Sequence, residues 1–164
     1  MSQPLSKSAA RVQEALRAAG LEARVVELPD STRSAQEAAA AIGCAVEQIA
    51  KSVVFRRLDD GSPVLAVLRG VDRVDTAALA ALLGTEVRRA DPELVRTVTG
   101  FAIGGVPPLG HETAILTILD SALLTYDTVW AAAGTPHSVF AICPRDLVSA
   151  AFMEVAAIAE RPAV

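Results

Sequence analysis

The sequence predicts a single α/β domain over residues 1–164, with helices flanking a curled, largely antiparallel mixed sheet. A length of 164 residues suits one domain, and neither a repeat nor a linker interrupts the chain. Hydrophobic residues make up 52% of the chain but aromatic residues only 4%, so the core must be mainly aliphatic. Strands and helices are interleaved, yet several strands are joined by hairpins, which excludes a simple doubly wound parallel sheet.

Helices are expected where apolar residues recur at helical spacing behind a capping residue. They cover residues 6–19, 34–43, 76–84, 91–100 and 144–151. Ser34 and Glu37 form a capping box at the start of the second helix, and Asp75 caps the third. Pro92 and Pro144 stand in the first turn of the last two, where proline is well tolerated.

Strands are expected where short apolar runs lie between turn residues. They cover residues 22–28, 49–57, 62–70, 113–120, 127–134, 137–142 and 154–159. The segment "LDDGS" between the second and third strands predicts a hairpin turn.

The charge of the chain limits its partners. A formal net charge of −4 argues against a protein that holds long nucleic acid, such as DNA, by bulk electrostatics. Residues 51–96 carry a slight positive excess, which permits a small basic patch, although a solvated face of mixed charge is the more ordinary explanation. The N-terminus lacks the apolar segment of a signal peptide, and no apolar run approaches the ~20 residues of a membrane span, so we expect a soluble cytoplasmic protein with no membrane partner.

Lys51 is unusual because it lies on an apolar face of an expected strand. Side chains alternate along a strand, so Ile49, Lys51, Val53 and Phe55 share one face. One explanation is a lysine at a strand end whose ammonium reaches water. The other is an ammonium at the mouth of an apolar cavity, where it would meet a phosphate or developing negative charge.

The segment "GGVPPLGH", residues 104–111, holds three glycines and two adjacent prolines, so it cannot lie inside a helix or a central strand. Its first two glycines allow a ligand to approach the main chain closely, and its prolines restrict the backbone that follows. We expect the amides of Gly105 and Val106 to be exposed and held in place, as an oxyanion hole requires. A structural turn is the commoner explanation of such a segment.

Three further side chains are candidates for chemistry. His111 and His137 suit general acid–base work. Asp120 ends an apolar strand and could orient a lysine, a histidine or a substrate amine, although a turn or cap residue explains it equally well. Cys44 and Cys143 are interpreted as buried small hydrophobic residues. No catalytic triad order, metal-ligand cluster or nucleotide-binding glycine loop is present in the sequence, so neither a metal nor a cofactor is expected.

Five segments follow one another in a specific order and spacing between residues 6 and 159. They are "IAKSVVF", "LAVLRGVDRVDTAALAALLG", "ADPELVRTVTGFAIGGVPPLGH", "TILDSALL" and "AAGTPHSVFAICPRDL". Together they resemble the YbaK/prolyl-tRNA-synthetase-associated editing-domain family, the free-standing aminoacyl-tRNA deacylases. The resemblance implies a mixed α/β fold with a curled central sheet and hydrolysis of an amino acid wrongly esterified to tRNA.

The resemblance also implies roles for single residues. Lys51 matches the strand lysine that helps to hold the acceptor-end adenosine and its phosphate. The loop that lines the family's pocket is matched by Gly104, Gly105, Val106, Pro107, Pro108 and Gly110, and His111 follows it. Gly134 matches a glycine that faces the pocket, and His137 falls close to a position where some relatives carry a functional histidine.

The chemistry implied by this family requires no strong protein nucleophile. An aminoacyl ester is already activated, so water or a group of the substrate can attack while the protein supplies orientation and oxyanion donors. The expected partner is the acceptor end of a tRNA that carries a small amino acid, and a modest basic patch around Lys51, Arg56, Arg57 and Arg69 would suffice to bind it. Two other functions stay open: a non-catalytic or regulatory module that binds a nucleotide or aminoacyl derivative, and a partner of an aminoacyl-tRNA synthetase.

Overall fold

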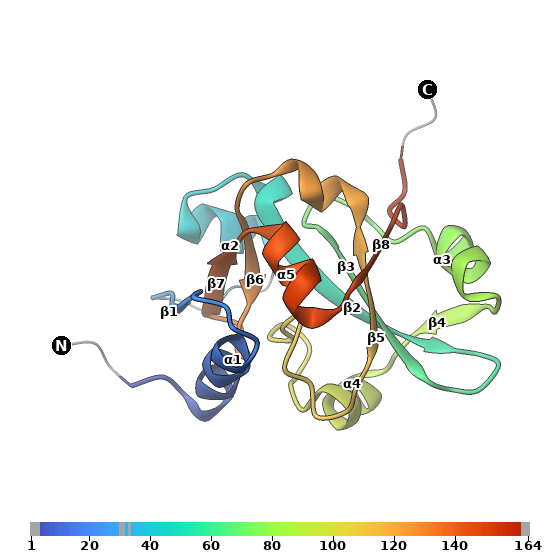
Figure 1. Ribbon diagram of the computed structural model, residues 1–164, viewed down its shortest axis with the longest axis horizontal. Helices are drawn as coiled ribbons and strands as arrows, with labels where there is room; N and C mark the ends of the chain where they lie inside the picture. The colour runs from blue at the N-terminus through green and yellow to red at the C-terminus, as the bar shows by residue number, and fades with distance from the viewer. Residues whose placement is uncertain (1–3, 30–31, 33, 162–164) are drawn as a thin grey trace.

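A mixed sheet forms the centre of the structure, a computed structural model that describes residues 4–29, 32 and 34–161 (Figure 1). Within these ranges eight strands are joined in the order β1-β7-β6-β2-β3-β5-β8, and β4 pairs with β2 off this path. The strands are β1 (Val25–Glu27), β2 (Ile49–Arg57), β3 (Pro63–Arg69), β4 (Val87–Arg89), β5 (Leu116–Asp120), β6 (Val129–Ala132), β7 (Ser138–Ile142) and β8 (Glu154–Ala156). The predicted mixed α/β class is confirmed.

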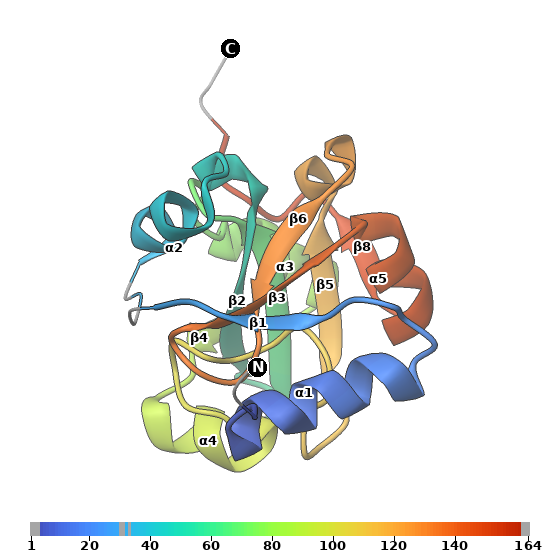
Figure 2. The same ribbon diagram turned by 90° about the vertical axis from the view of Figure 1, so that its left-hand side faces the viewer.

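Helices surround this sheet on several sides (Figures 1 and 2). The α-helices of the described ranges are α1 (Lys7–Ala18), α2 (Ala35–Ile42), α3 (Thr76–Leu83), α4 (Pro92–Thr99) and α5 (Pro144–Ala151). Two short 3-10 helices, η1 (Val46–Gln48) and η2 (Ser121–Thr125), complete the set. None of these helices has the length and apolar character needed to cross a bilayer.

The sheet contains both parallel and antiparallel pairings. β1 pairs with β7, β7 with β6, and β2 with both β3 and β4 in antiparallel fashion. β2 with β6, β3 with β5, and β5 with β8 are parallel. Figure 2 shows β1 crossing in front of β2 and β3, so the sheet is curled as the sequence predicted.

Along the edge opposite β3, β2 pairs with two different strands, β6 at one end and β4 at the other, and we call this arrangement the fork of β2. Its pairing with β6 covers only Ile49 and Ala50, whereas its pairing with β4 begins at Phe55. Residues 51–54 therefore lie between two diverging partner strands. The Ala90 amide donates a hydrogen bond to the Val54 carbonyl (2.9 Å), which marks the β4 side of this fork.

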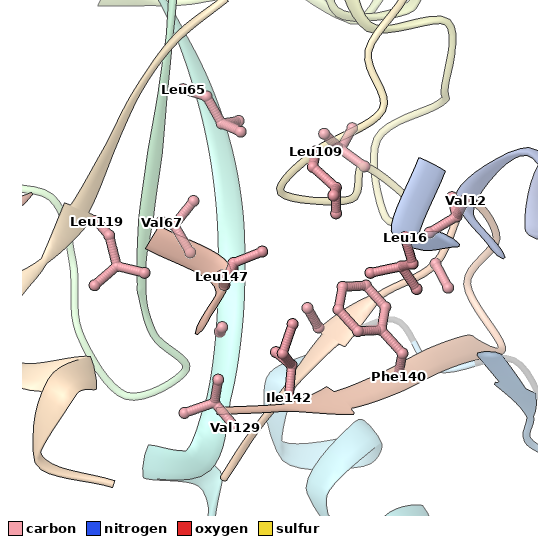
Figure 3. Close-up of a cluster of buried hydrophobic side chains, with 14 of the residues drawn as sticks. Val12, Leu16, Leu65, Val67, Leu109, Leu119, Val129, Phe140, Ile142 and Leu147 are labelled. Atoms are coloured by element: carbon pink, nitrogen blue, oxygen red, sulfur yellow. The ribbon is translucent and has the colours of Figure 1, made fainter. Parts of the chain in front are cut away.

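The largest group of buried side chains lies on the side of the sheet covered by α1, α4 and α5. Val12 and Leu16 of α1 pack there with Phe140 of β7, and Leu147 of α5 joins them from the far side (Figure 3). A smaller cluster on the opposite side joins Leu79 of α3 to Phe55, Val64, Ala66, Ile118 and Ile158. β2 contributes to both clusters, which fixes its position in the molecule.

The predicted helix starts are confirmed in detail. The Ser34 hydroxyl accepts a hydrogen bond from the Glu37 amide (3.1 Å), and the carboxylates of Asp75 and Asp91 likewise accept from amides three residues on. β4 was not predicted, because three residues of which two are arginines show no apolar alternation. It forms through its pairing with residues 55–57 of β2.

The loop at residues 104–111 packs into the main core. Pro107, Pro108 and Leu109 are buried, and Leu109 points toward the cluster that contains Leu16 and Phe140 (Figure 3). Nε2 of His111 donates to the Pro107 carbonyl at 2.7 Å, which closes the loop on itself.

Two glycines bring this loop against the turn between β6 and β7. The Gly134 amide donates to the Gly105 carbonyl at 2.8 Å, and a Cβ on Gly105 would lie 2.7 Å from the Gly134 carbonyl carbon. Gly134 has a φ of +98°, and a Cβ on it would lie 2.7 Å from the carbonyl oxygen of Ser8 in α1. The main chains of α1, the turn and the loop are therefore stacked too closely for any side chain.

Gly134→Ala is expected to destabilise the protein more than Gly61→Ala. Both positions have positive φ, so both substitutions carry backbone strain, but a Cβ on Gly61 meets no atom within 4 Å. Overpacking against Ser8 should lower the free energy of unfolding of Gly134→Ala by a further 1–3 kcal/mol, roughly. Urea denaturation of both variants measures this difference; equal losses would show that α1 does not confine the turn.

Candidate functional site

A cavity of about 230 Å³ lies at the fork of β2. Residues 49–53 of β2 form one wall, and residues 130–132 of β6 with Ser138 and Val139 of β7 form another. Gly104 and Val106 of the loop and the first residues of α2 close the remaining sides. The cavity exists because no strand fills the gap between β6 and β4.

Lys51 stands on the wall of this cavity. Its Nζ donates to the Gly70 carbonyl at 3.4 Å, and the side chain is only partly exposed. Burial lowers the pKa of the ammonium; the Asp72 carboxylate raises it, and the guanidinium groups of Arg89 and Arg73 lower it again. The structure thus places Lys51 at a cavity, as one of its two explanations required, and a catalytic role for it stays a prediction.

The main chain of the loop is arranged differently from the expectation. The Gly105 amide donates to the Ala102 carbonyl at 3.0 Å, so the prediction that this amide is exposed for a ligand is wrong. Its carbonyl is occupied as well, by the Gly134 amide. Gly104 and Val106 line the cavity. Gly105, which directly precedes Val106, is held in place by the hydrogen bonds of its amide and its carbonyl. The backbone of Val106 is therefore the better candidate for an oxyanion donor.

Asp120 does not line the cavity and is fully buried elsewhere. Its carboxylate accepts hydrogen bonds from the amides of Ala122, Ile158 and Ala159 at 2.9–3.2 Å. Arg161 contributes an ion pair to it at 2.6 Å. The structure supports the explanation of Asp120 as a cap and anchor rather than as a group that touches substrate.

The other predicted residues do not line the cavity. Pro107, Pro108 and His111 build the loop from behind, and burial lowers the pKa of His111. A Cβ on Gly110 would lie 2.8 Å from the Cβ of Ala15, so that glycine packs on α1.

In the turn between β6 and β7, Gly134 does not line the cavity, although its neighbours Thr135 and Pro136 do. His137 lies outside, with Nε2 4.0 Å from the Glu27 carboxylate.

The positive charge at the cavity comes from arginines other than those expected. Arg57 is paired with Asp59 at 2.9 Å, and Arg69 with Asp72 at 2.8 Å, so these two cations are largely compensated. Arg89 lines the cavity instead, and Arg73 is close enough to influence Lys51. Sequence reasoning missed Arg89 as a site residue because it depends on β4, which only tertiary pairing reveals.

Several small polar side chains at the cavity were also missed. The Ser138 and Thr135 hydroxyls are hydrogen-bonded to each other at 2.5 Å, and Thr32 donates to the Pro136 carbonyl at 2.7 Å. Ser52 also lines the cavity, and its buried Oγ has no hydrogen-bond partner among the described residues. Strand alternation places Ser52 on the face opposite Lys51, so the sequence carried no signal that both residues line one cavity. In the described part of the chain, no three His, Cys, Asp or Glu side chains come together in a way that could hold a metal ion.

Comparison with known proteins assigns the family. Residues 29–150 match the profile of the family described as "Aminoacyl-tRNA editing domain". The chain is 32% identical over 133 residues to YwhH of Bacillus subtilis, a match that covers 80% of this chain and 83% of that protein. It is 28% identical over 138 residues to the proline–tRNA ligase of Pelobacter propionicus, and there it spans only 24% of the ligase.

Solved structures agree with this assignment. One described as "a putative trans-editing enzyme for prolyl tRNA synthetase" is 47% identical, with a TM-score of 0.91 over 96% of this chain and all of that one. A second, the hypothetical protein APE2540, is 31% identical, with a TM-score of 0.86 over 92% of this chain and 99% of that one. The chain belongs to the aminoacyl-tRNA editing domain family.

Proposed function

We propose that this protein is a trans-editing hydrolase that deacylates mischarged aminoacyl-tRNA carrying a small amino acid. The observation that carries the proposal is the cavity in the fork of β2, where Lys51 and the main chain of the Gly104–Val106 segment line one space in a member of the editing-domain family. Fold alone would not suffice, because function depends on the site.

The proposed reaction divides the work between substrate and protein. Water attacks the ester carbonyl, the carbon–oxygen bond to the ribose breaks, and the proton of the water passes to the ribose oxygen, which leaves a free amino acid and a ribose hydroxyl. If a hydroxyl of the substrate attacks first, the new ester that it forms must be hydrolysed by water in a second step. The Val106 amide supports the proposal because a fixed donor can stabilise the oxyanion that forms. Lys51 would hold the terminal adenosine and its phosphate through its charge.

The electrostatics of the site suit the end of a tRNA rather than a long duplex. Arg89 lines the cavity next to Lys51, and Arg73 lies within their electrostatic reach, whereas the whole chain carries a net charge of −4. A few cations at one cavity can bind one or two phosphates without bulk attraction to nucleic acid. Binding of the acceptor end is therefore part of the proposal.

The relatives suggest which tRNA is edited. Several curated relatives are proline–tRNA ligases, and one solved neighbour is described in terms of prolyl tRNA synthetase. We therefore extend the proposal to tRNA mischarged by prolyl-tRNA synthetase, with that synthetase as a partner. The cavity volume of about 230 Å³ suits a small aminoacyl group together with part of the adenosine.

A panel of mischarged tRNAs tests the proposal directly. Alanyl, seryl, cysteinyl and threonyl esters of tRNA specific for proline should include at least one that the protein hydrolyses well above the spontaneous rate. Release of radiolabelled amino acid measures the reaction. If no ester is hydrolysed with protein in excess over substrate, the catalytic proposal fails and a binding module becomes the better explanation.

Lys51→Ala is expected to lower kcat/KM on the preferred ester by about a hundredfold or more, because a positioned charge at the reacting end is lost. Lys51→Arg should not restore full activity, since a planar guanidinium does not replace an ammonium in a confined site. Lys7→Ala is the matched control, because Lys7 is exposed on α1. Wild-type activity in Lys51→Ala would remove Lys51 from the site.

The pH dependence of the deacylation rate should also show whether Lys51 must be charged. Because burial lowers the pKa of this ammonium, the enzyme should lose activity as the pH rises through a value below the ordinary lysine pKa of 10.5. Single-turnover deacylation, corrected for spontaneous hydrolysis, gives this alkaline limb. Lys51→Arg, which keeps its charge in that range, should lack the limb; an identical limb in both proteins contradicts the assignment.

A further inference from the structure

The Lys51 ammonium donates a hydrogen bond to the turn after β3, residues 69–72, which is held in place by ion pairs. Its Nζ reaches the carbonyl of Gly70, the first residue after β3. The Gly70 amide donates back to the Ile49 carbonyl at 2.8 Å, and a Cβ on Gly70 would lie 2.7 Å from Ala35. The position of the ammonium therefore depends on the conformation of residues 69–72.

Asp72 closes this turn from the other end. Its amide donates to the Arg69 carbonyl at 3.0 Å, and Arg69 donates through Nε and Nη2 to both carboxylate oxygens at 2.8 and 3.1 Å. Such two-point pairing fixes direction as well as distance. Arg69 also contacts the Tyr126 hydroxyl at 3.2 Å, which ties the turn to the end of η2.

A second arginine reaches the same carboxylate from the C-terminal segment. Arg161 lies 3.4 Å from Asp72 and 2.6 Å from Asp120, so it bridges two acidic side chains that are 8% and 0% exposed. Asp120 is itself fixed by the amides of Ile158 and Ala159. A continuous set of ion pairs thus runs from the buried end of β5 to the turn that carries Gly70.

We propose that Asp72, clamped between Arg69 and Arg161, is a positioning residue for the Lys51 ammonium. It fixes the turn whose carbonyl receives Lys51, and its negative charge offsets the cations that surround that lysine. Asp120 acts one step further away, through Arg161. The inference rests on the proposed function for its catalytic consequence, but the link between Asp72 and Lys51 can be tested without any substrate.

The charges around Lys51 determine the sign of each expected effect. Asp72 and Arg73, in and next to the turn after β3, and Arg89, on β4, are the charged groups that act on the pKa of Lys51. The cavity walls from α2, β6 and β7 contribute no charged side chain to the lining. Removing the Asp72 charge leaves these cations and Arg69 uncompensated, whereas removing the Arg161 charge leaves the negative charge of Asp72 less compensated. The two changes should move the pKa of Lys51 in opposite directions.

The chain offers a direct measurement, because Lys7 and Lys51 are its only lysines. Protein labelled with ¹³C at lysine Cε gives two NMR signals, and the exposed Lys7 serves as an internal reference. Asp72→Asn is expected to move the Lys51 titration to lower pH, and Arg161→Gln to move it to higher pH. Asp59→Asn is the matched control, since it removes a carboxylate paired with Arg57 on the exposed hairpin, and it should move neither signal.

Activity provides the second measurement. Asp72→Asn and Arg161→Gln should each lower kcat/KM by about tenfold or more through misplacement of the ammonium, whereas Asp59→Asn should not. Lys51 titrations that stay unchanged in both variants, or that move in the same direction, overturn the proposal. If Asp72→Asn does not fold, the upward shift in Arg161→Gln alone decides. Opposite shifts in a protein that hydrolyses no ester would support the link to Lys51 and reject only the catalytic proposal.

Discussion

The close approach of two main chains at Gly105 and Gly134 is the constraint on which the site depends. Their hydrogen bond of 2.8 Å holds the loop of residues 104–111 against the turn between β6 and β7. Without it, nothing in the sheet would close the fork that β2 forms with β6 and β4. Ser8 of α1 lies behind Gly134 and prevents the turn from retreating. The cavity is thus made by backbone contacts, and side chains only complete its surface.

This architecture is compatible with the proposed ester hydrolysis, which needs no activated protein nucleophile. The cavity offers a lysine held at a carbonyl, an arginine on a neighbouring strand, a fixed main-chain segment and a few hydroxyl groups. Such a set can orient a bound group and stabilise charge, and the described lining residues include no histidine or carboxylate that could activate one of the hydroxyls as a nucleophile. An activated ester needs no more, which agrees with membership of an editing family.

Most of the fold could be predicted from local sequence patterns. The site could be predicted only in part, because several of its contacts join elements that are far apart in the sequence. Ser34, Asp75 and Asp91 cap their helices as expected, and the strand over residues 49–57 has the predicted bounds, because each depends on neighbours in sequence. The Gly105 amide could not be assigned in this way, since its partner is chosen by how the loop folds. Arg89 and the pairing of Arg69 with Asp72 likewise depend on contacts between separate elements. Asp120 does not contact Lys51 directly, contrary to one hypothesis for it. It is connected to the turn that holds Lys51 only through the ion pairs of Arg161 with Asp120 and Asp72.

The segment that defines the family begins at residue 29, after α1 and β1. Those first elements are nevertheless part of the same folding unit, since Val12 and Leu16 lie at the centre of the main core and β1 pairs with β7. A chain trimmed to residues 29–150 would lose the support behind Gly134 and expose an apolar surface in its place. The segment matched by the family profile thus contains every residue that lines the cavity, whereas the helix that packs behind Gly134 lies before it.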